Sequence, residues 1–251
     1  MYAVTMKARA TVFTLLSILA IAGCTHTQDK TEEHPPVTIP TVESSQSVPS
    51  PEPVTHVTAI PAKSIALTFD DGPSEYTDRI LDILEEEDVP ATFFVIGSQV
   101  TPDQYPTLKR MSGDGMEIAA HTWSHADLSH SSDNTVKNEL DKTSEAIKQV
   151  TGDPTTCYRP PYGATSPRVR SLAEDQGYTT EQLWGIDSED WQLPGADKIF
   201  KNATQSADTP ESPSVLLMHD GGGPREQTLE ALPRIIQYYK DHGYTFTVSC
   251  L

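Results

Sequence analysis

Basic residues are scarce in this chain of 251 residues: 18 lysines and arginines stand against 36 aspartates and glutamates, and the formal net charge is −18. Such an excess of negative charge disfavours anionic polymers, so we expect no nucleic-acid partner. The sequence has no glycine-rich phosphate loop, which argues against nucleotide-dependent phosphoryl transfer. It also has no internal repeat, which argues against solenoid and propeller architectures. The apolar residues 11–22 are too few to span a bilayer comfortably.

The N-terminal residues have the features of an export signal. Two basic residues precede the apolar residues 11–22, whose length is typical of a signal-peptide core, and the segment ends in Ile21-Ala22-Gly23-Cys24. This ending resembles a bacterial lipoprotein signal, whose cysteine is lipidated and becomes the mature N-terminus. We therefore expect residues 1–24 to be a lipoprotein signal peptide, and the protein to sit on the outer face of the bacterial membrane through a lipid anchor alone. An ordinary secretory signal with an incidental Cys24 is the alternative and gives a secreted protein; Met6 is a second possible start.

Residues 25–62 have the composition of a linker. They hold seven prolines and eleven serines or threonines but no aromatic residue. Such a segment buries too little apolar surface to offset its ordering entropy, so we expect it to be disordered and extended. At about 3.1 Å per residue it would reach on the order of 100 Å from an anchored Cys24. Residues 63–251 are predicted to form one folded domain.

Two further cysteines, Cys157 and Cys250, lie in that domain. An even pair in an oxidising compartment can form a disulfide, provided that the Cα atoms come within about 7 Å. Two buried free thiols are the alternative, and the sequence does not decide between them.

Short runs of strand-like composition alternate with helical patterns from residue 65 onward. Helix-start signals at Ser132 and Ser166-Pro167 support the assignment. The alternation predicts an α/β fold with about seven parallel strands. The strand-like runs are 65–69, 91–96, 117–120, 155–159, 182–186, 215–218 and 244–248; the helical segments are 76–87, 102–111, 133–150, 167–176, 196–204 and 226–242.

Five short polar motifs follow the first, third, fourth, fifth and sixth of these runs. Residues at the carboxyl ends of parallel strands gather at one end of a (β/α) barrel, where the active sites of such barrels lie. An open doubly wound sheet would also gather its loops there, but motifs on five strands converge more naturally in a closed or nearly closed barrel. The motifs are Thr68-Phe69-Asp70-Asp71-Gly72, His121-Thr122-Trp123-Ser124-His125, Arg159-Pro160-Pro161-Tyr162-Gly163, Asp187-Ser188-Glu189-Asp190-Trp191 and Leu217-Met218-His219-Asp220.

The first two motifs together have the residue types of a catalytic metal site. His121 and His125 are four residues apart, a spacing that suits one metal ion. One carboxylate of Asp70-Asp71 would complete a set of three ligands, which leaves positions open for water and substrate, and the other carboxylate could act as a base. The His-Glu-x-x-His pattern of metalloproteases is absent, since Thr122-Trp123 stands where the glutamate would be.

Taken together, the five motifs resemble those of the polysaccharide deacetylases, carbohydrate esterase family 4. The resemblance covers essentially all of residues 63–251, including Asp220-Gly221-Gly222-Gly223. It implies a distorted (β/α) barrel and a metal-dependent hydrolase that removes acetyl groups. It also implies that Asp71, His121 and His125 bind one divalent metal ion, with Zn²⁺ expected and Co²⁺, Mn²⁺ or Ni²⁺ as alternatives.

The resemblance assigns the acid and base roles to the other motif residues. Asp70 is expected to be the general base, with Arg159 orienting it and keeping it ionised. His219 is expected to be the general acid for the leaving amine, and Asp190 to raise the pKa of His219 and fix its tautomer. The backbone N–H of Tyr162 is expected to bind the oxyanion, and its ring can face the substrate.

The remaining aromatic and apolar positions carry weaker expectations. Leu217 and Trp191 would enclose the acetyl methyl group. Trp123 could pack under the metal loop or stack on a sugar ring, and Trp184 is expected in the core. Asp187 could orient a neighbouring group or cap a turn.

The expected substrate is the N-acetylglucosamine of cell-wall peptidoglycan, because a lipid anchor and a long linker favour a wall polymer. Chitin oligomers and acetylated xylan are alternatives, since the same site can cleave amides and esters. A non-catalytic carbohydrate-binding lipoprotein is the rival from another class, but no catalytic position is missing. We expect a monomer.

Overall fold

The computed structural model describes residues 63–205 and 214–250, so the expectations for residues 1–24 and 25–62 concern residues outside the described part. Within the described part, no helix is long and apolar enough to cross a membrane.

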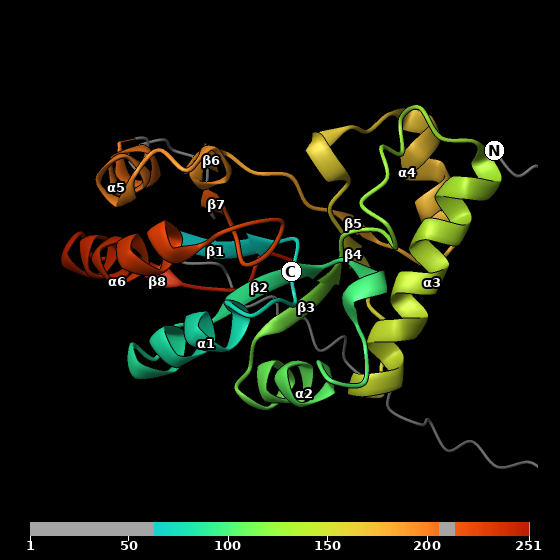
Figure 1. The fold of residues 1–251 in the computed structure, drawn as a ribbon. Helices are drawn as coiled ribbons and strands as arrows, with labels where there is room; N and C mark the ends of the chain where they lie inside the picture. Colours follow the sequence, from blue (N-terminus) through green and yellow to red (C-terminus); the bar gives the residue numbers. More distant parts are fainter. Residues whose placement is uncertain (1–62, 206–213, 251) are drawn as a thin grey trace, which may run out of the picture. The chain divides into compact units, whose positions relative to one another are not determined.

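A single parallel sheet forms the centre of the described domain (Figure 1). The strands occur in the order β5-β4-β3-β2-β1-β7-β6, and β8 pairs with β1. Each strand pair is parallel, which confirms the predicted α/β fold with about seven parallel strands. The strands are β1 Ser64–Asp70, β2 Ala91–Val95, β3 Glu117–Ala120, β4 Cys157–Tyr158, β5 Thr180–Glu181, β6 Ile186–Asp187, β7 Ser214–His219 and β8 Thr245–Phe246.

Helices follow most of the strands, as predicted. The Ser132 and Ser166 side chains accept hydrogen bonds from the backbone N–H groups of Thr135 and Val169, and so cap α3 and α4. The α-helices are α1 Thr77–Glu86, α2 Tyr105–Gly113, α3 Asp133–Thr151, α4 Pro167–Glu174, α5 Ala196–Thr204 and α6 Glu226–Asp241; single 3₁₀ turns are η1 Gly97–Gln99, η2 Pro161–Gly163 and η3 Asp190–Gln192.

The predicted strand at 182–186 is wrong in its bounds. The segment is the link between β5 and β6, the two edges of the sheet, and only Ile186 belongs to a strand. Five Cα–Cα steps, from Glu181 to Ile186, span at most about 18 Å. The edges must therefore lie near each other although they do not pair, so the sheet curls into a half-barrel whose gap is crossed by this link (Figure 1).

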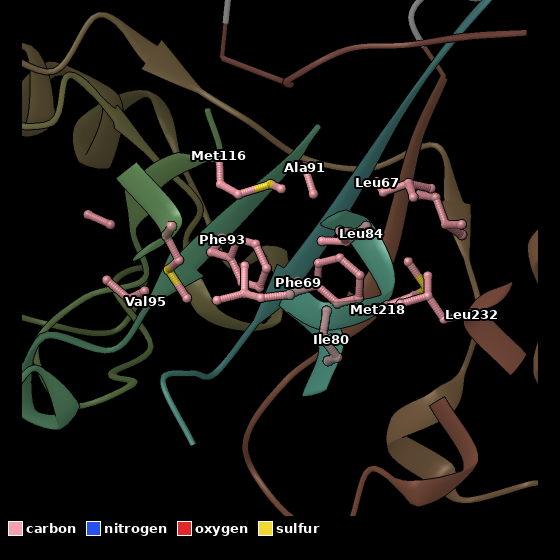
Figure 2. Packing of buried hydrophobic residues seen from close by; sticks show 14 of the residues in the cluster. Leu67, Phe69, Ile80, Leu84, Ala91, Phe93, Val95, Met116, Met218 and Leu232 are labelled. Carbon is pink, nitrogen blue, oxygen red and sulfur yellow. The ribbon is translucent and has the colours of Figure 1, made fainter. Parts of the chain in front are cut away.

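Alternate side chains of the strands point to opposite faces of the curled sheet. The outer face packs on the helices and makes the main hydrophobic core, in which Phe69 and Phe93 stack with ring centroids 5.1 Å apart. Figure 2 shows this packing, which includes Leu67, Phe69, Ile80, Leu84, Ala91, Phe93, Val95, Met116, Met218 and Leu232.

The inner face carries the polar residues at the carboxyl ends of the strands. In the strand register, Asp70 lies beside His219 on one side and Phe94 on the other. One step earlier on the same face, Thr68 lies beside Leu217. Parallel register thus brings side chains from different motifs into adjacent rows.

The C-terminal residues cross the opposite end of the inner face. The backbone N–H of Ser249 donates to Thr92, and that of Cys250 donates to Glu117, near the starts of β2 and β3. Cys250 then forms a disulfide with Cys157, the first residue of β4, with their Cα atoms 6.0 Å apart. Of the two alternatives that the sequence leaves open, the structure has the disulfide.

Candidate active site

Asp71, His121 and His125 converge on one point at the carboxyl ends of β1 and β3. One ligand atom from each lies within 4.8 Å of those of the other two. The Asp71 Oδ1 atom is 3.5 Å from His121 Nε2 and 3.3 Å from His125 Nε2. Asp71 lies in the loop after β1, and both histidines lie in the loop after β3, as the sequence predicts.

The hydrogen bonds of this group fit a bound cation. His121 Nδ1 lies 2.8 Å from the backbone carbonyl of Arg159, which can only accept, so Nδ1 carries the hydrogen and Nε2 presents a lone pair in the neutral ring. Burial lowers the pKa of His121 to about 3, which keeps it neutral. Asp71 Oδ1 is buried without a hydrogen-bond donor in the described residues. Electron pairs thus face one another, and a divalent ion would satisfy them.

Backbone strain concentrates around the same point. Four residues have φ values in the left-handed region, which residues other than glycine rarely adopt. They are Asp71, Thr122, His125 and Tyr162, with φ values of 75°, 65°, 60° and 61°. Such conformations cluster where the surrounding structure holds a functional geometry. A Cβ atom at Gly222 would overlap the Asp71 carboxylate, so glycine is required for that close approach.

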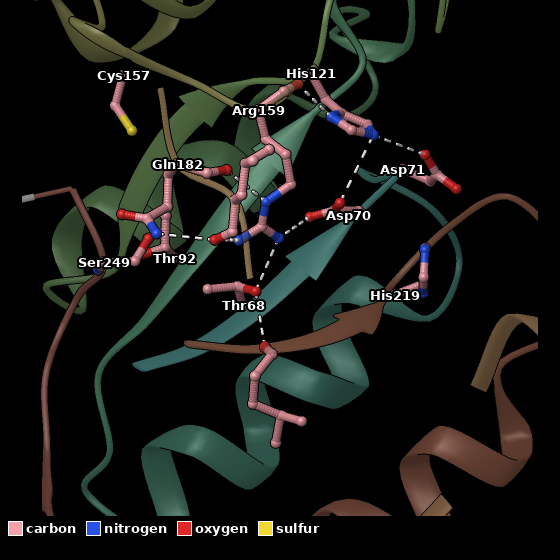
Figure 3. Close-up of polar contacts among 12 residues, drawn as sticks. Thr68, Asp70, Asp71, Thr92, His121, Cys157, Arg159, Gln182, His219 and Ser249 are labelled. Carbon is pink, nitrogen blue, oxygen red and sulfur yellow. Dashed lines mark hydrogen bonds and ion pairs between the residues drawn. The ribbon is translucent and has the colours of Figure 1, made fainter. Parts of the chain in front are cut away.

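Asp70 and Arg159 form a buried ion pair beside this group (Figure 3). Arg159 Nη1 donates to Asp70 Oδ1 over 2.7 Å and to the hydroxyl of Thr68 over 2.9 Å. Asp70 Oδ2 is 3.7 Å from His121 Nε2, on the side of the metal ligands. Burial raises the pKa of Asp70 above its ordinary value, and the Arg159 charge opposes that rise.

The link between β5 and β6 holds the Arg159 guanidinium in place. The Nε and Nη2 atoms donate to the backbone carbonyls of Gln182 and Leu183 over 3.0 and 3.4 Å. The guanidinium carbon lies 4.0 Å from the ring centroid of Phe94 and 5.7 Å from that of Trp184. Hydrogen bonds to these carbonyls and cation–π contacts with these rings therefore hold the guanidinium group of Arg159 in position.

His219 and Asp190 form a second pair on the other side of the site. His219 Nδ1 lies 2.7 Å from Asp190 Oδ1, so Nε2 is the nitrogen available to a ligand. Asp190 Oδ2 accepts from the His219 backbone N–H and from the Thr228 hydroxyl, over 2.9 and 2.7 Å. Burial by itself lowers the pKa of His219, but the hydrogen bond and charge of Asp190 outweigh it and raise that pKa above its ordinary value.

One pocket joins these groups. Eight of the ten predicted site residues line it, while Arg159 and Asp190 lie behind Asp70 and His219. Leu217 is buried in its wall, whereas Tyr162 and Trp191 are 70% and 53% exposed. The lining residues are Asp70, Asp71, His121, His125, Tyr162, Trp184, Asp187, Trp191, Leu217 and His219.

The structure contradicts the expectation for Trp184 and selects between the alternatives for Asp187 and Trp123. Trp184 was expected in the core, but it lines the pocket and packs against Gly163, because the link it occupies crosses the barrel gap. Asp187 also lines the pocket, and its Oδ1 accepts the backbone N–H of Glu189, which confirms the turn cap. Trp123 does not line the pocket and packs close to Gly97, under the metal loop.

Asp220, the last residue of the fifth motif, is a buried acid to which the sequence assigns no role. Its Oδ2 accepts from the Thr77 hydroxyl over 2.6 Å, while Oδ1 has no donor among the described residues. Burial raises the pKa of Asp220 to about 7, with the charge of Asp71 adding to the rise. A Cβ atom at Gly72 would overlap this carboxylate, so Asp220 packs directly beneath the loop that carries Asp71.

The fold and the site have counterparts among known proteins. The family model for polysaccharide deacetylases matches residues 58–180. A peptidoglycan-N-acetylglucosamine deacetylase of Bacillus cereus is 37% identical over 190 residues, which cover 74% of this chain and 87% of that protein. A chitooligosaccharide deacetylase of Sinorhizobium fredii is 35% identical over 195 residues, 73% of this chain and 88% of that protein.

A solved structure agrees with these sequence relatives. It is a family 4 acetyl xylan esterase from Clostridium thermocellum in complex with a cobalt ion, 30% identical, with a TM-score of 0.68. The match covers 74% of this chain and 88% of that chain. On these matches, the chain belongs to the polysaccharide deacetylase family.

Proposed function

We propose that the protein is a metal-dependent hydrolase that removes acetyl groups from the N-acetylglucosamine units of peptidoglycan. One observation carries the proposal: the Asp70–Arg159 pair and the His219–Asp190 pair flank the three converging ligand atoms of Asp71, His121 and His125 in one pocket. A base, an acid and a cation site within one pocket are the parts that hydrolysis of an unactivated amide requires.

Asp71, His121 and His125 would hold the metal ion, and we propose Zn²⁺, with Co²⁺, Mn²⁺ or Ni²⁺ as alternatives. One carboxylate and two imidazoles are a ligand set of catalytic zinc sites. When bound, the ion would polarise the acetyl carbonyl and lower the pKa of water. The related acetyl xylan esterase was solved in complex with a cobalt ion, which supports metal binding by a protein of this family.

Asp70 takes the proton from the attacking water. Its Oδ1 is held by Arg159, so Oδ2 faces the metal ligands and the pocket. The guanidinium stabilises the ionised form that a base needs, while burial keeps the carboxylate more basic than one in water. The developing oxyanion would lie near the backbone N–H of Tyr162, whose ring centroid is 4.8 Å from that of His125.

His219 gives a proton to the leaving nitrogen. Asp190 occupies Nδ1, so the proton to be transferred is the one on Nε2. The raised pKa of His219 favours the protonated form that a proton donor needs. The buried Leu217 and the indole of Trp191 enclose the acetyl methyl group between the two pairs.

The location and the polymer are parts of the same proposal. The sequence at residues 1–24 supports export and lipidation of Cys24 on the outer face of a bacterial membrane, and secretion if Cys24 is not lipidated. The linker composition of residues 25–62 then allows a monomeric domain to reach the wall. The relatives include enzymes named for peptidoglycan, chitooligosaccharides and acetyl xylan, so the choice of peptidoglycan rests on the export signal and the linker.

The metal requirement has a direct test. The chelated protein should release no acetate, and added Zn²⁺ or Co²⁺ should restore release and raise the melting temperature, because an ion that binds only the folded state stabilises it. His125→Ala should lose both effects. The exposed His130→Ala is the matched control and should keep both. If His125→Ala still binds one ion per chain as tightly as the wild type, the assignment of the metal ligands is wrong.

A further inference from the structure

Asp187 lies beside the residues assigned to the acetyl group and the leaving nitrogen. The parallel register of β6 and β7 sets Asp187 against Leu217. Residues paired across neighbouring strands point to the same side of a sheet, and so does the residue two positions along, here His219. All three accordingly line the same pocket.

The Asp187 carboxylate has one oxygen fixed and one free for a ligand. Its Oδ1 accepts the backbone N–H of Glu189 over 2.7 Å, which orients the side chain. Among residues 63–205 and 214–250, no side chain or backbone group donates to Oδ2. Asp187 does not orient the general acid, since Nδ1 of His219 is bound to Asp190.

Amide cleavage changes the nitrogen that sits beside this carboxylate. The oxygen of water joins the acetyl carbon, one of the two water protons goes to Asp70, the C–N bond breaks, and nitrogen takes the proton from His219. The acetic acid so formed gives its remaining proton to solvent and leaves as acetate, and the sugar amine becomes a cationic ammonium when it takes up one proton from solvent. Before cleavage the nitrogen has one N–H to donate, and afterwards it has three and a positive charge. A carboxylate can bind both forms, and a charge-assisted hydrogen bond is the stronger of the two.

The same carboxylate would stabilise a bound ester, or its product, far less than it stabilises the amide and the ammonium product. Its scissile oxygen has no hydrogen to donate, and the product hydroxyl is uncharged. We propose that Asp187 Oδ2 binds the nitrogen of the amino sugar, and thereby makes the site selective for N-acetylated over O-acetylated saccharides. This inference rests on the deacetylase activity proposed above.

Asp187→Asn tests the inference because it keeps the size of the side chain and the acceptor for Glu189 but removes the charge. The full chain, loaded with Zn²⁺, is assayed on an N-acetylglucosamine tetramer and on p-nitrophenyl acetate. The ratio of kcat/KM for the amide to that for the ester should fall by about tenfold or more, since charged hydrogen bonds of this kind are worth at least that factor. Glu189→Gln, an acid-to-amide change on the same loop outside the pocket lining, should keep the wild-type ratio.

A binding measurement covers the case in which ester hydrolysis is too slow to measure. A fully deacetylated glucosamine tetramer should bind Asp187→Asn about tenfold or more weakly than the wild type by calorimetry, since the ammonium loses its counter-charge. An unchanged amide-to-ester ratio, or without ester activity an unchanged affinity for the glucosamine tetramer, overturns the inference. If the zinc-loaded wild type releases no acetate from any substrate, the proposed function has failed, and the affinity for the glucosamine tetramer still decides the role of Asp187.

Discussion

Arg159 donates to Asp70 over 2.7 Å in a place where both residues are buried, so the candidate base and its cationic partner are shielded from water together. A buried pair of this kind is strongly coupled, because each charge depends on the other to offset its loss of hydration. The pair lies on the inner face of the curled sheet, one side chain from β1 and the other from the residue after β4.

Asp70→Asn should reduce acetate release by about 10²- to 10⁴-fold, the usual contribution of a general base. The amide keeps an acceptor for Arg159 but cannot take a proton. Metal content, measured by mass spectrometry, should stay near one ion per chain because Asp71 and both histidines remain. Asp82→Asn, an exposed acid on α1, is the control and should keep full activity. More than a tenth of wild-type activity in Asp70→Asn would mean that another group is the base.

Asp190→Asn should shift the alkaline limb of the pH–rate profile to lower pH. His219 must be protonated to donate, so activity is lost as pH rises through its pKa. Burial alone lowers that pKa and Asp190 raises it, so removing the Asp190 charge lowers it. The profile of kcat/KM measures the effect, with Asp197→Asn on the surface of α5 as the control. An unmoved alkaline limb would contradict the assignment of His219 as the acid.

Gly222→Ala should weaken metal binding. The added Cβ would overlap the Asp71 carboxylate, at a backbone φ of +71°. We expect affinity for Zn²⁺ to fall about 10- to 100-fold, as for other changes that displace a metal ligand from its support. Gly243→Ala is a matched control, since its φ is +70° but open space surrounds it, so it carries the backbone strain alone. Equal Zn²⁺ affinities for the two variants would contradict a role of the Gly222 contact with Asp71 in metal binding.

Replacing Cys157 and Cys250 by serine should lower stability more than activity. The disulfide closes a sequence separation of 93 residues, and loss of such a bond costs about 2–5 kcal/mol of unfolding free energy. It ties the C-terminal residues to the starts of the strands, away from the carboxyl ends that carry the site. Denaturant unfolding measures the first effect and acetate release at 25 °C the second. A double variant that is as stable as the wild type would refute the structural role.

The sequence predicts the site better than it predicts the edges of the sheet. The motif residues are identifiable because chemistry restricts their types, and the strands before two of the motifs are buried runs, residues 65–69 and 215–218. The two-residue strand β5 has no composition signal, since pairing with β4 alone defines it. The link through Trp184 has the apolar character of a strand, but its position is set by the curl of the whole sheet. That tertiary feature also explains why Trp184 lines the pocket.

The sequence also does not predict the local backbone conformations of the site. The left-handed conformations of Asp71 and His125 depend on loops held by distant groups, such as Gln99, whose side chain donates to the Asp71 carbonyl over 3.0 Å. The disulfide likewise depends on where the last residues cross the inner face. Residue types indicated the chemistry, and long-range packing determined which groups stand beside it, Asp187 among them.

Acetate release by the Zn²⁺-loaded chain is the most direct test of the central claim, with peptidoglycan, N-acetylglucosamine oligomers and acetylated xylan measured side by side and Asp70→Asn as the inactive control. We predict metal-dependent release from peptidoglycan that exceeds release from the other two and is lost in Asp70→Asn. Release mainly from chitin oligomers or xylan would support the deacetylase activity but contradict peptidoglycan as the substrate. No release from any of them, with the metal bound, would contradict the enzyme itself and favour a carbohydrate-binding lipoprotein.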